Sequence, residues 1–312
     1  MAAPLASFPL TPARLPLFLS VWPCRAVADL VATLKSSHVY RPTEDVGGAN
    51  RAVLQQVATA TVALAERELG GADSRAGVVA DALAVVQAVL AVEHRAIQQH
   101  LPSLWPLLWS GAGGEEAAAA PDRSVPTAVA CSLVAAYAEL RQLGLLLESL
   151  VAALHTEAGA RGAAAQAAAG VLCSPAFLGQ LSAAVAQLPS GQVASIPGLV
   201  AAGVPALVAL DASSALVLVL SRLYCCCLSS MRVDLTTAPA VAGACRALLA
   251  ALASPLLLLL GQAVKGSAPC IAGHMLPALL QLYSSCLRIH AQCANLHPEV
   301  RLYISLSGPR IC

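Results

Sequence analysis

The chain has 312 residues and a formal net charge of +1, and 66 of its residues are alanine. The small net charge excludes nucleic-acid binding through a strong positive field, because neutralising many phosphates requires a surplus of Lys and Arg. Aromatic residues make up only 4%. This composition excludes a collagen, an all-β sandwich and a disordered acidic tail, and it favours a mostly helical protein.

Residues 1–24 are rich in proline and are expected to be an irregular N-terminus. The first 28 residues also lack acidic groups, but Pro16 and Pro23 bound the apolar stretch, so a targeting peptide is disfavoured. A helical segment is expected over 25–110. It should hold a first helix from Arg25, a second from Thr43 to Gly70 and a third over about 74–100, followed by residues 101–109, which Pro102 and Pro106 break up.

The low-complexity stretch 111–125 predicts a linker, and a helical-repeat segment is expected over 126–297. Its helices are predicted at about 127–155, 174–188, 199–230, 239–253, 255–264 and 270–295, with 189–198 as a turn. Ser174 and Ser254 each precede a proline, the pattern of an N-cap and a first-turn proline. Residues 158–170 are either a weak helix or a second linker, and 298–312 are expected to be a ragged C-terminus.

Helices that each carry a broad apolar face and are joined by short breakers indicate antiparallel stacking. The predicted fold class is therefore all-α, an irregular α-solenoid of stacked antiparallel helices similar to ARM and HEAT repeats. No fixed repeat is found at periods of about 34 or 40 to 47 residues. A helical bundle stays open as an alternative.

Four metal-competent side chains, Cys286, His290, Cys293 and His297, share one stripe of the predicted last helix, within an arc of about 60°. A single straight helix cannot place four ligands tetrahedrally around one ion. The stripe also continues an apolar seam through Met275, Leu279 and Leu282. We therefore expect these cysteines to pack in the core, with no metal site and no cofactor.

Other candidate sites are also better explained by packing. Eleven cysteines without regular spacing favour reduced, buried thiols, and Cys225, Cys226 and Cys227 cannot face one site because consecutive helical residues diverge by about 100°. Trp105 and Trp109, four residues apart, are either a partner anchor or, more simply, core. The Gly-rich stretch 111–114 lacks the Lys of a phosphate loop, and no catalytic motif is present, so the protein is not expected to be an enzyme.

The mean hydropathy of +0.72 requires membrane insertion to be weighed. The candidate spans are 247–264, which Ser254 and Pro255 should split, and 198–220, which carries Asp211 at its centre. Buried core helices explain both stretches better. The alternative is a small integral membrane or organelle protein with spans near 198–220 and 247–264.

Four stretches carry a family resemblance: HRAIQQHLPSLWPLLW (94–109), LVAAYAELRQL (133–143), LPSGQVASI (188–196) and CLSSMRVDL (227–235). In order and spacing they resemble an internal region of the unhealthy ribosome biogenesis protein 2 family, the Urb/Npa nucleolar proteins, of the plant and green-algal type. The similar region covers about 90–240. None of the four stretches is a catalytic signature, so no residue is carried over as functional.

The resemblance implies a helical scaffold in the nucleolus, within the nucleus, that supports large-subunit ribosome biogenesis and pre-rRNA processing through protein binding. Its partners would be other assembly proteins of the pre-large-subunit particle, with indirect or local contact to RNA and no membrane. The family's C-terminal domain is not matched here. The resemblance therefore implies that the chain is either an internal fragment of a longer protein or a truncated gene model.

Overall fold

A computed structural model describes residues 49–70, 76–110, 124–139, 141–156, 163–209, 215–265 and 269–296. These residues form helices and short turns, and no strand occurs among them, so the predicted all-α class is confirmed. The N-terminus up to Thr43, most of the 111–125 stretch, Asp211 and the 298–312 tail lie outside the described residues. The chain divides into two compact units, Met1–Glu139 and Leu140–Cys312.

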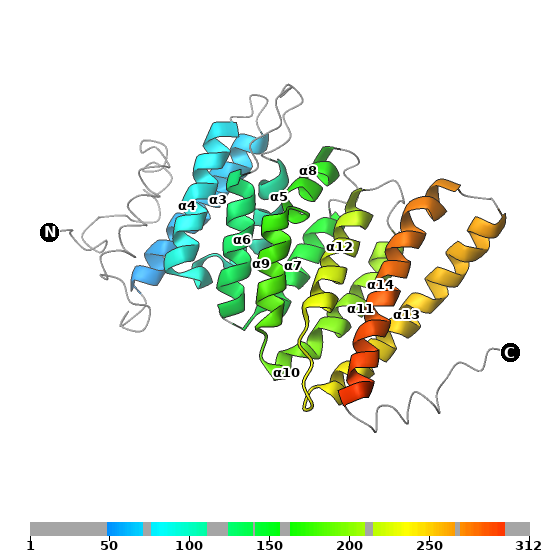
Figure 1. Cartoon of the computed structure of the whole chain (residues 1–312). Coiled ribbons are helices and arrows are strands. Elements are labelled where there is room, and N and C mark those ends of the chain that lie inside the picture. Colours follow the sequence, from blue (N-terminus) through cyan, green and yellow to red (C-terminus); the bar gives the residue numbers. More distant parts are fainter. Residues whose placement is uncertain are drawn as a thin grey trace. The chain divides into compact units, whose positions relative to one another are not determined.

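The first unit contains four α-helices among its described residues (Figure 1). They are α3 (Ala49–Gly70), α4 (Ala76–Val92), α5 (Leu101–Ser110) and α6 (Ser124–Glu139), with the short 3-10 helices η2 (His94–Ala96) and η3 (Gln98–His100) between α4 and α5. Helix α4 packs against both α3 and α6, and α5 also contacts both of them. The predicted end of a helix at Gly70 is confirmed.

The predicted helix over 74–100 is wrong beyond Val92, because the chain turns at Glu93. The backbone of Glu93 leaves the helical region, and its carboxylate accepts a hydrogen bond from the backbone N–H of Arg95. The same buried carboxylate lies 3.4 Å from Nε of Arg51 on α3. A buried charge needs such partners, so Glu93 fixes this turn against α3.

Residues 101–110 form one helix, so the expected break at Pro102 and Pro106 is wrong. Pro102 lies in the first turn, where its missing N–H has no intrahelical acceptor to lose. Pro106 does remove one hydrogen bond, but Trp105 and Trp109 on the same helix are fully buried. Burial of these large side chains offsets the cost of the interior proline.

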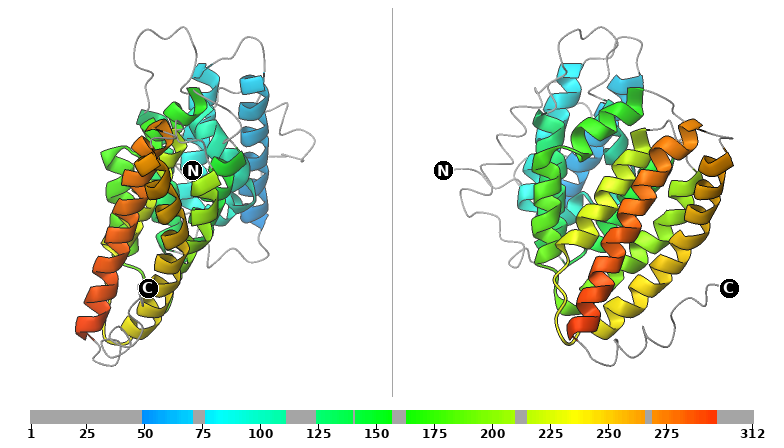
Figure 2. Two further views of the ribbon diagram at one scale, coloured as in Figure 1. Left: turned by 90° about the vertical axis from the view of Figure 1, so that its right-hand side faces the viewer. Right: turned by 45° about the vertical axis from the view of Figure 1, so that its right-hand side comes forward.

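The second unit arranges its helices in two rows (Figures 1 and 2). One row holds α7 (Leu143–Thr156), α11 (Ser195–Ala209) and α13 (Ala238–Lys265); the other holds α8 (Ala163–Leu172), α9 (Pro175–Ala186), α12 (Ala215–Ser230) and α14 (Pro269–Leu296). Helix α11 contacts α7 and α13, while α12 contacts α8, α9 and α14. The long helices α13 and α14 form a hairpin that joins the two rows.

Several predicted boundaries in this part of the chain are wrong. The long helix expected over 127–155 is two helices, because Arg141 adopts φ 57° between α6 and α7 and a left-handed residue ends a right-handed helix. The expected 199–230 helix is also two, α11 and α12. The expected turn at 189–198 contains the one-turn helix α10 (Ser190–Val193) and the start of α11. Residues 163–172 form helix α8, so of the two alternatives for 158–170, a weak helix or a linker, the helix holds from Ala163 onward.

Helix α13 runs unbroken through Ser254 and Pro255, so the split expected there is wrong. The buried residues of its inward face continue across the proline: Leu248 and Leu252 precede it, and Leu256 and Leu259 follow it. Because these leucines lie on one face of the helix, their burial favours one continuous helix over two short ones. By contrast, Ser174 does cap α9, accepting a hydrogen bond from the N–H of Phe177, as predicted.

The tip of the Tyr224 ring, from α12, lies against the backbone of Gly203 on α11. A Cβ atom on Gly203 would overlap the phenol, with Tyr224 Cζ only 2.7 Å away. Both residues are buried, and the Tyr224 hydroxyl has no hydrogen-bond partner among the described residues. The absence of a side chain at Gly203 therefore allows this helix contact.

We predict that Gly203→Ala lowers the free energy of unfolding by about 1–3 kcal/mol, the usual cost of overpacking a core. Urea unfolding followed by circular dichroism measures it. Gly179→Ala is the matched control, because a Cβ there meets nothing within 4 Å and should stabilise α9 slightly. Tyr224→Phe removes the overlapping oxygen and should restore part of the loss. Equal stability of the Gly203→Ala and wild-type chains would contradict the close approach.

Candidate functional site

The thiol and imidazole stripe of α14 lies in the core of the α13–α14 hairpin. Cys286 and Cys293 are fully buried and continue the buried seam of Met275, Leu279 and Leu282, as the sequence predicted. The Cys286 Sγ donates a weak hydrogen bond to the backbone carbonyl of Cys245 on α13, at 3.3 Å. His297 lies outside the described residues.

The pKa shifts of Cys245, Cys293 and His290 favour their neutral forms. The neighbouring Cys286 thiol and burial raise the pKa of Cys245, and burial raises the pKa of Cys293 to about 11. Burial and the charge of Arg246 lower the pKa of His290. Among the residues that the structure describes, no three His, Cys, Asp or Glu side chains lie in an arrangement that could hold a metal ion.

The adjacent cysteines on α12 diverge, as expected for consecutive helical residues. Cys227 is buried, whereas Cys226 is half-buried and its Sγ donates to the Leu178 carbonyl of α9 at 3.4 Å. Cys225 lines a groove of about 310 Å³ between α12 and α14, together with Ser229, Gln281, Ser284, Ser285 and Arg288. Burial raises the pKa of all three thiols, so they are poor nucleophiles near neutral pH.

Trp105 and Trp109 form a core contact and not an exposed anchor. Their rings stack with centroids 6.5 Å apart and an interplanar angle of 12°. Both side chains are fully buried, and neither indole N–H has an acceptor among the described residues. The core interpretation is confirmed, and this pair is not available to bind a partner.

The polar cluster that the structure assembles lies instead at one edge of the second unit, at the ends of its helices. Gln192 Nε2 donates to the backbone carbonyl of Arg141 at 2.6 Å, and Ser190 Oγ donates to Asp234 Oδ2 at 2.8 Å. These bonds tie together the turn before α7, the short helix α10 and the turn before α13. We call the set Arg141, Ser190, Gln192, Arg232, Asp234 and Leu235 the turn edge.

Asp234 organises the turn that leads into α13. Its Oδ1 accepts hydrogen bonds from the backbone N–H of Thr236 at 3.0 Å and of Thr237 at 2.8 Å, and from both threonine hydroxyls. Together with the Ser190 hydroxyl, these donors hold the pKa of Asp234 well below its usual range. These hydrogen bonds hold the turn, in which the side chain of Leu235 is 63% exposed.

Sequence reasoning did not find the turn edge. One signal was available: an Asp followed two and three residues later by threonines, just before a helix, is typical of a capping turn. The other contacts carry no such signal, because they join residues 44 and 51 positions apart. Three of the four stretches quoted in the sequence analysis nevertheless reach this edge, at Arg141, at 188–196 and at 227–235.

Comparison with known proteins gives no further information: no family model, no curated protein and no solved structure matches the chain.

We predict that Asp234→Ala lowers the melting temperature at neutral pH, because four donors on Thr236 and Thr237 lose their acceptor. The pKa of Asp234 is lower in the folded chain than in the unfolded chain, so its carboxylate stabilises the fold above its ordinary pKa of 3.8. This contribution is lost as the pH falls through the folded value. The difference in melting temperature between wild type and variant should therefore shrink on acidification.

Thermal unfolding at a series of pH values from about 7 down to about 2 measures this difference, because the loss begins only below the ordinary pKa of 3.8. Glu148→Ala, which removes another exposed carboxylate of the same unit, is the matched control. A difference that is the same at every pH would show that the Asp234 charge does not contribute.

Proposed function

We propose that this chain is a non-enzymatic helical scaffold, an irregular α-solenoid of the ARM/HEAT kind, that acts in the nucleolus. There it would bind other assembly proteins of the pre-large-subunit ribosomal particle and support pre-rRNA processing. The observation that carries the proposal is the convergence of three family-like stretches at the turn edge, through the Gln192–Arg141 and Ser190–Asp234 hydrogen bonds. Residues that are far apart in sequence thus build one surface.

The arrangement of the second unit supports the solenoid part of the proposal. Successive helices add to two rows, so each new pair packs mainly on the previous pair, which is the plan of a stacked helical array. The raised pKa values of the buried thiols support a non-enzymatic role, because a protonated thiol is a weak nucleophile.

The charge of the second unit suits anionic partners. Its described residues carry six basic side chains, Arg141, Arg222, Arg232, Arg246, Lys265 and Arg288, against the two acidic side chains of Glu148 and Asp234. Both Arg141 and Arg232 are exposed at the turn edge. Local contact with RNA phosphates or with acidic assembly proteins is therefore part of the proposal, although the whole chain is close to neutral.

Cell fractionation tests the proposal with the tagged full chain in cells that express it. We expect the wild-type chain to localise to the nucleolus and to sediment with pre-large-subunit particles, and its depletion to cause large-subunit rRNA precursors to accumulate. The variant Arg232→Glu/Leu235→Ala should fold normally, because both side chains are exposed, but should shift to lighter fractions.

Leu145→Ala is the control for that variant, since Leu145 is 46% exposed on α7 and lies outside the turn edge. Diffuse cytosolic localisation of the wild-type chain would contradict the nucleolar role. Equal sedimentation of the turn-edge variant and wild type would contradict the use of this edge.

A second candidate function, a small integral membrane or organelle protein, is favoured by α13. Among the described residues it is the one unbroken helix long and apolar enough to cross a membrane, and only 22% of its most apolar window is buried. The other proposed span, 198–220, is divided between α11 and α12. Carbonate extraction separates the two functions: retention in the membrane pellet supports insertion, whereas release supports the scaffold.

A further inference from the structure

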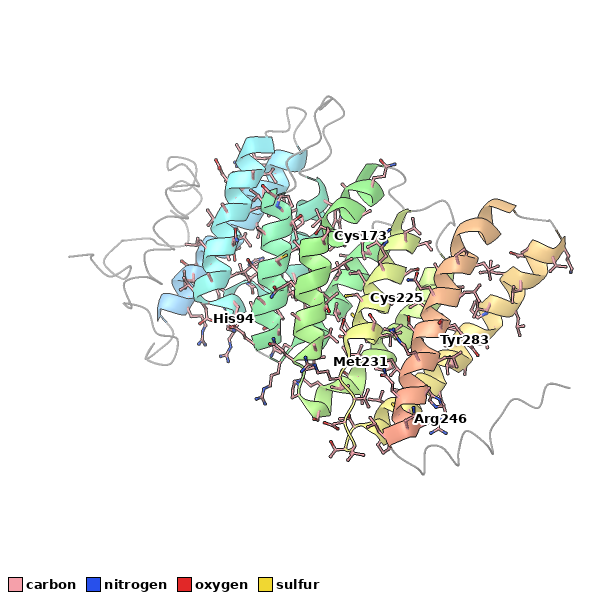
Figure 3. The ribbon with its side chains drawn as sticks, in the orientation of Figure 1. His94, Cys173, Cys225, Met231, Arg246 and Tyr283 are labelled. Atoms are coloured by element: carbon pink, nitrogen blue, oxygen red, sulfur yellow. The ribbon has the colours of Figure 1, made fainter. Side chains whose placement is uncertain are left out.

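The groove between α12 and α14 is lined by polar side chains from both helices. Its volume is about 310 Å³, and Cys225 lies on its α12 side (Figure 3). The lining consists of Cys225 and Ser229 of α12 and of Gln281, Ser284, Ser285 and Arg288 of α14. The α12 residues are four positions apart, and the α14 residues follow at intervals of three, one and three, so each set lies on one face of its helix. Two polar stripes therefore border the groove.

Most of the donors in the groove have no protein partner. Gln281, Ser284 and Arg288 make no hydrogen bond and no ion pair with the other residues that the structure describes. On the other side of α12 the polar groups pair directly, since Ser230 Oγ donates to Ser182 Oγ of α9 at 2.9 Å. The groove towards α14 thus holds donors that the fold itself does not use.

The groove contains a positive charge and no negative one. Arg288 supplies a guanidinium, and neither α12 nor α14 contains an Asp or Glu. Burial raises the pKa of the Cys225 thiol, although Ser285 and Arg288 act in the opposite direction, so this thiol is neutral near pH 7. Asp234, in the turn after α12, is already bonded to donors of its own turn and to Ser190. An anion in the groove would therefore meet no carboxylate on either wall.

The donors match the oxygens of a phosphoryl group. A guanidinium pairs with two phosphate oxygens at once through its planar fork of N–H groups. Ser284 and Ser285 add hydroxyl donors, and Gln281 adds an amide NH2. Gln281 and Arg288 are about 10 Å apart along the helix axis, one on each side of the two serines, and both side chains are long enough to reach a group between them.

The size and lining of the groove indicate which carrier of phosphate it suits. Its 310 Å³ is about ten times the ~30 Å³ share of a water molecule, enough for a phosphoryl group and the short side chain that carries it. No aromatic residue is among the described residues that line it, so a nucleobase has no ring to stack on. Neutralising an RNA backbone requires a track of basic residues, and this groove has Arg288 alone.

The charge of the ligand also favours a phosphorylated side chain over an RNA backbone. A phosphoserine carries close to two negative charges and three terminal oxygens, whereas each phosphodiester of RNA carries one charge and two free oxygens. Three terminal oxygens fit a lining that combines one guanidinium fork with separate hydroxyl and amide donors. A single bound monoester would therefore use more of the donors in the groove than a diester.

We propose that the groove between α12 and α14 binds a phosphorylated serine or threonine side chain of a partner protein. Arg288 pairs with two phosphoryl oxygens, and Ser284, Ser285 and Gln281 donate to the phosphoryl group from the same face of α14. This inference rests on the proposed scaffold function, because it names the chemistry of one partner. Binding of that partner would then depend on its phosphorylation.

Titration of the purified full chain tests the groove. The probe is N-acetyl-phosphoserine N-methylamide, followed by calorimetry and by its phosphorus NMR signal. We expect a dissociation constant of about 1 mM or below, the range that a few charge-assisted hydrogen bonds supply. The unphosphorylated serine amide should not bind. The methyl phosphodiester of the same probe should bind about tenfold or more weakly, because it has lost one charge and one terminal oxygen.

Variants locate the binding. Arg288→Gln should weaken the phosphoserine probe about tenfold or more, because it removes the charge and the fork but keeps a long polar side chain. Ser284→Ala/Ser285→Ala should weaken it about threefold or more and keep the helical circular dichroism, since alanine favours a helix. Arg222→Gln is the matched control, because Arg222 is also exposed, lies on α12 and does not line the groove.

Several results would overturn the inference. No binding of the probe at about 10 mM would contradict the site itself. Equal losses in Arg288→Gln and Arg222→Gln would mean that the binding is general attraction to positive charge. Inorganic phosphate that binds as tightly as the probe would assign the groove to the free ion. A single-stranded RNA of about ten nucleotides that displaces the probe and binds more tightly would assign it to RNA.

The two proposals fail separately. Probe binding is measured on the purified chain and does not depend on its location in the cell. A chain that binds the phosphoserine probe through Arg288 but never enters the nucleolus would contradict only the proposed function. A nucleolar chain that does not distinguish the phosphoserine probe from its unphosphorylated form would contradict only the phosphoryl groove.

Discussion

Close packing between helices with small side chains is the constraint on which this structure depends. The chain has few aromatic residues and 66 alanines, so its helices gain burial only when they approach each other closely. The contact between Gly203 and Tyr224 shows the consequence, because a single methyl group there would overlap the Tyr224 ring. The thiols between α13 and α14 fill their interface in the same way, as small apolar groups in a tight seam.

The Ser-Pro dipeptide occurs at residues 174–175 and again at 254–255, and the two cases show how far local sequence could predict the fold. Ser174 and Pro175 start α9, and the axis bends by 54° between α8 and α9, so the local signal determined the outcome. Ser254 and Pro255 carry the same signal but lie inside α13. There the leucines on both sides of the proline share one buried seam, and that long-range burial exceeds the cost of one lost hydrogen bond. The sequence contains both effects but does not show which is larger.

The candidate sites also differ in whether local sequence could predict them. The burial of Cys286 and Cys293 could be predicted, because the heptad of apolar residues before them defines the face on which they lie. The turn edge could not be predicted, because its hydrogen bonds join turns from different helix pairs, and no periodic pattern links residues that far apart. Only the capping turn at Asp234 carries a local signal, since its acceptor and its donors lie within three residues of each other.

The second unit thus presents a polar surface at one edge, where the turns before α7 and α13 meet α10. The turn edge is polar and fixed by hydrogen bonds, so a partner that binds there meets donors, acceptors and arginines that are already in place, and little ordering is needed. By contrast, the exposed leucines of α13, Leu257 at 71% and Leu258 at 59%, offer no hydrogen bonds, so a contact there would gain only from burial of apolar surface.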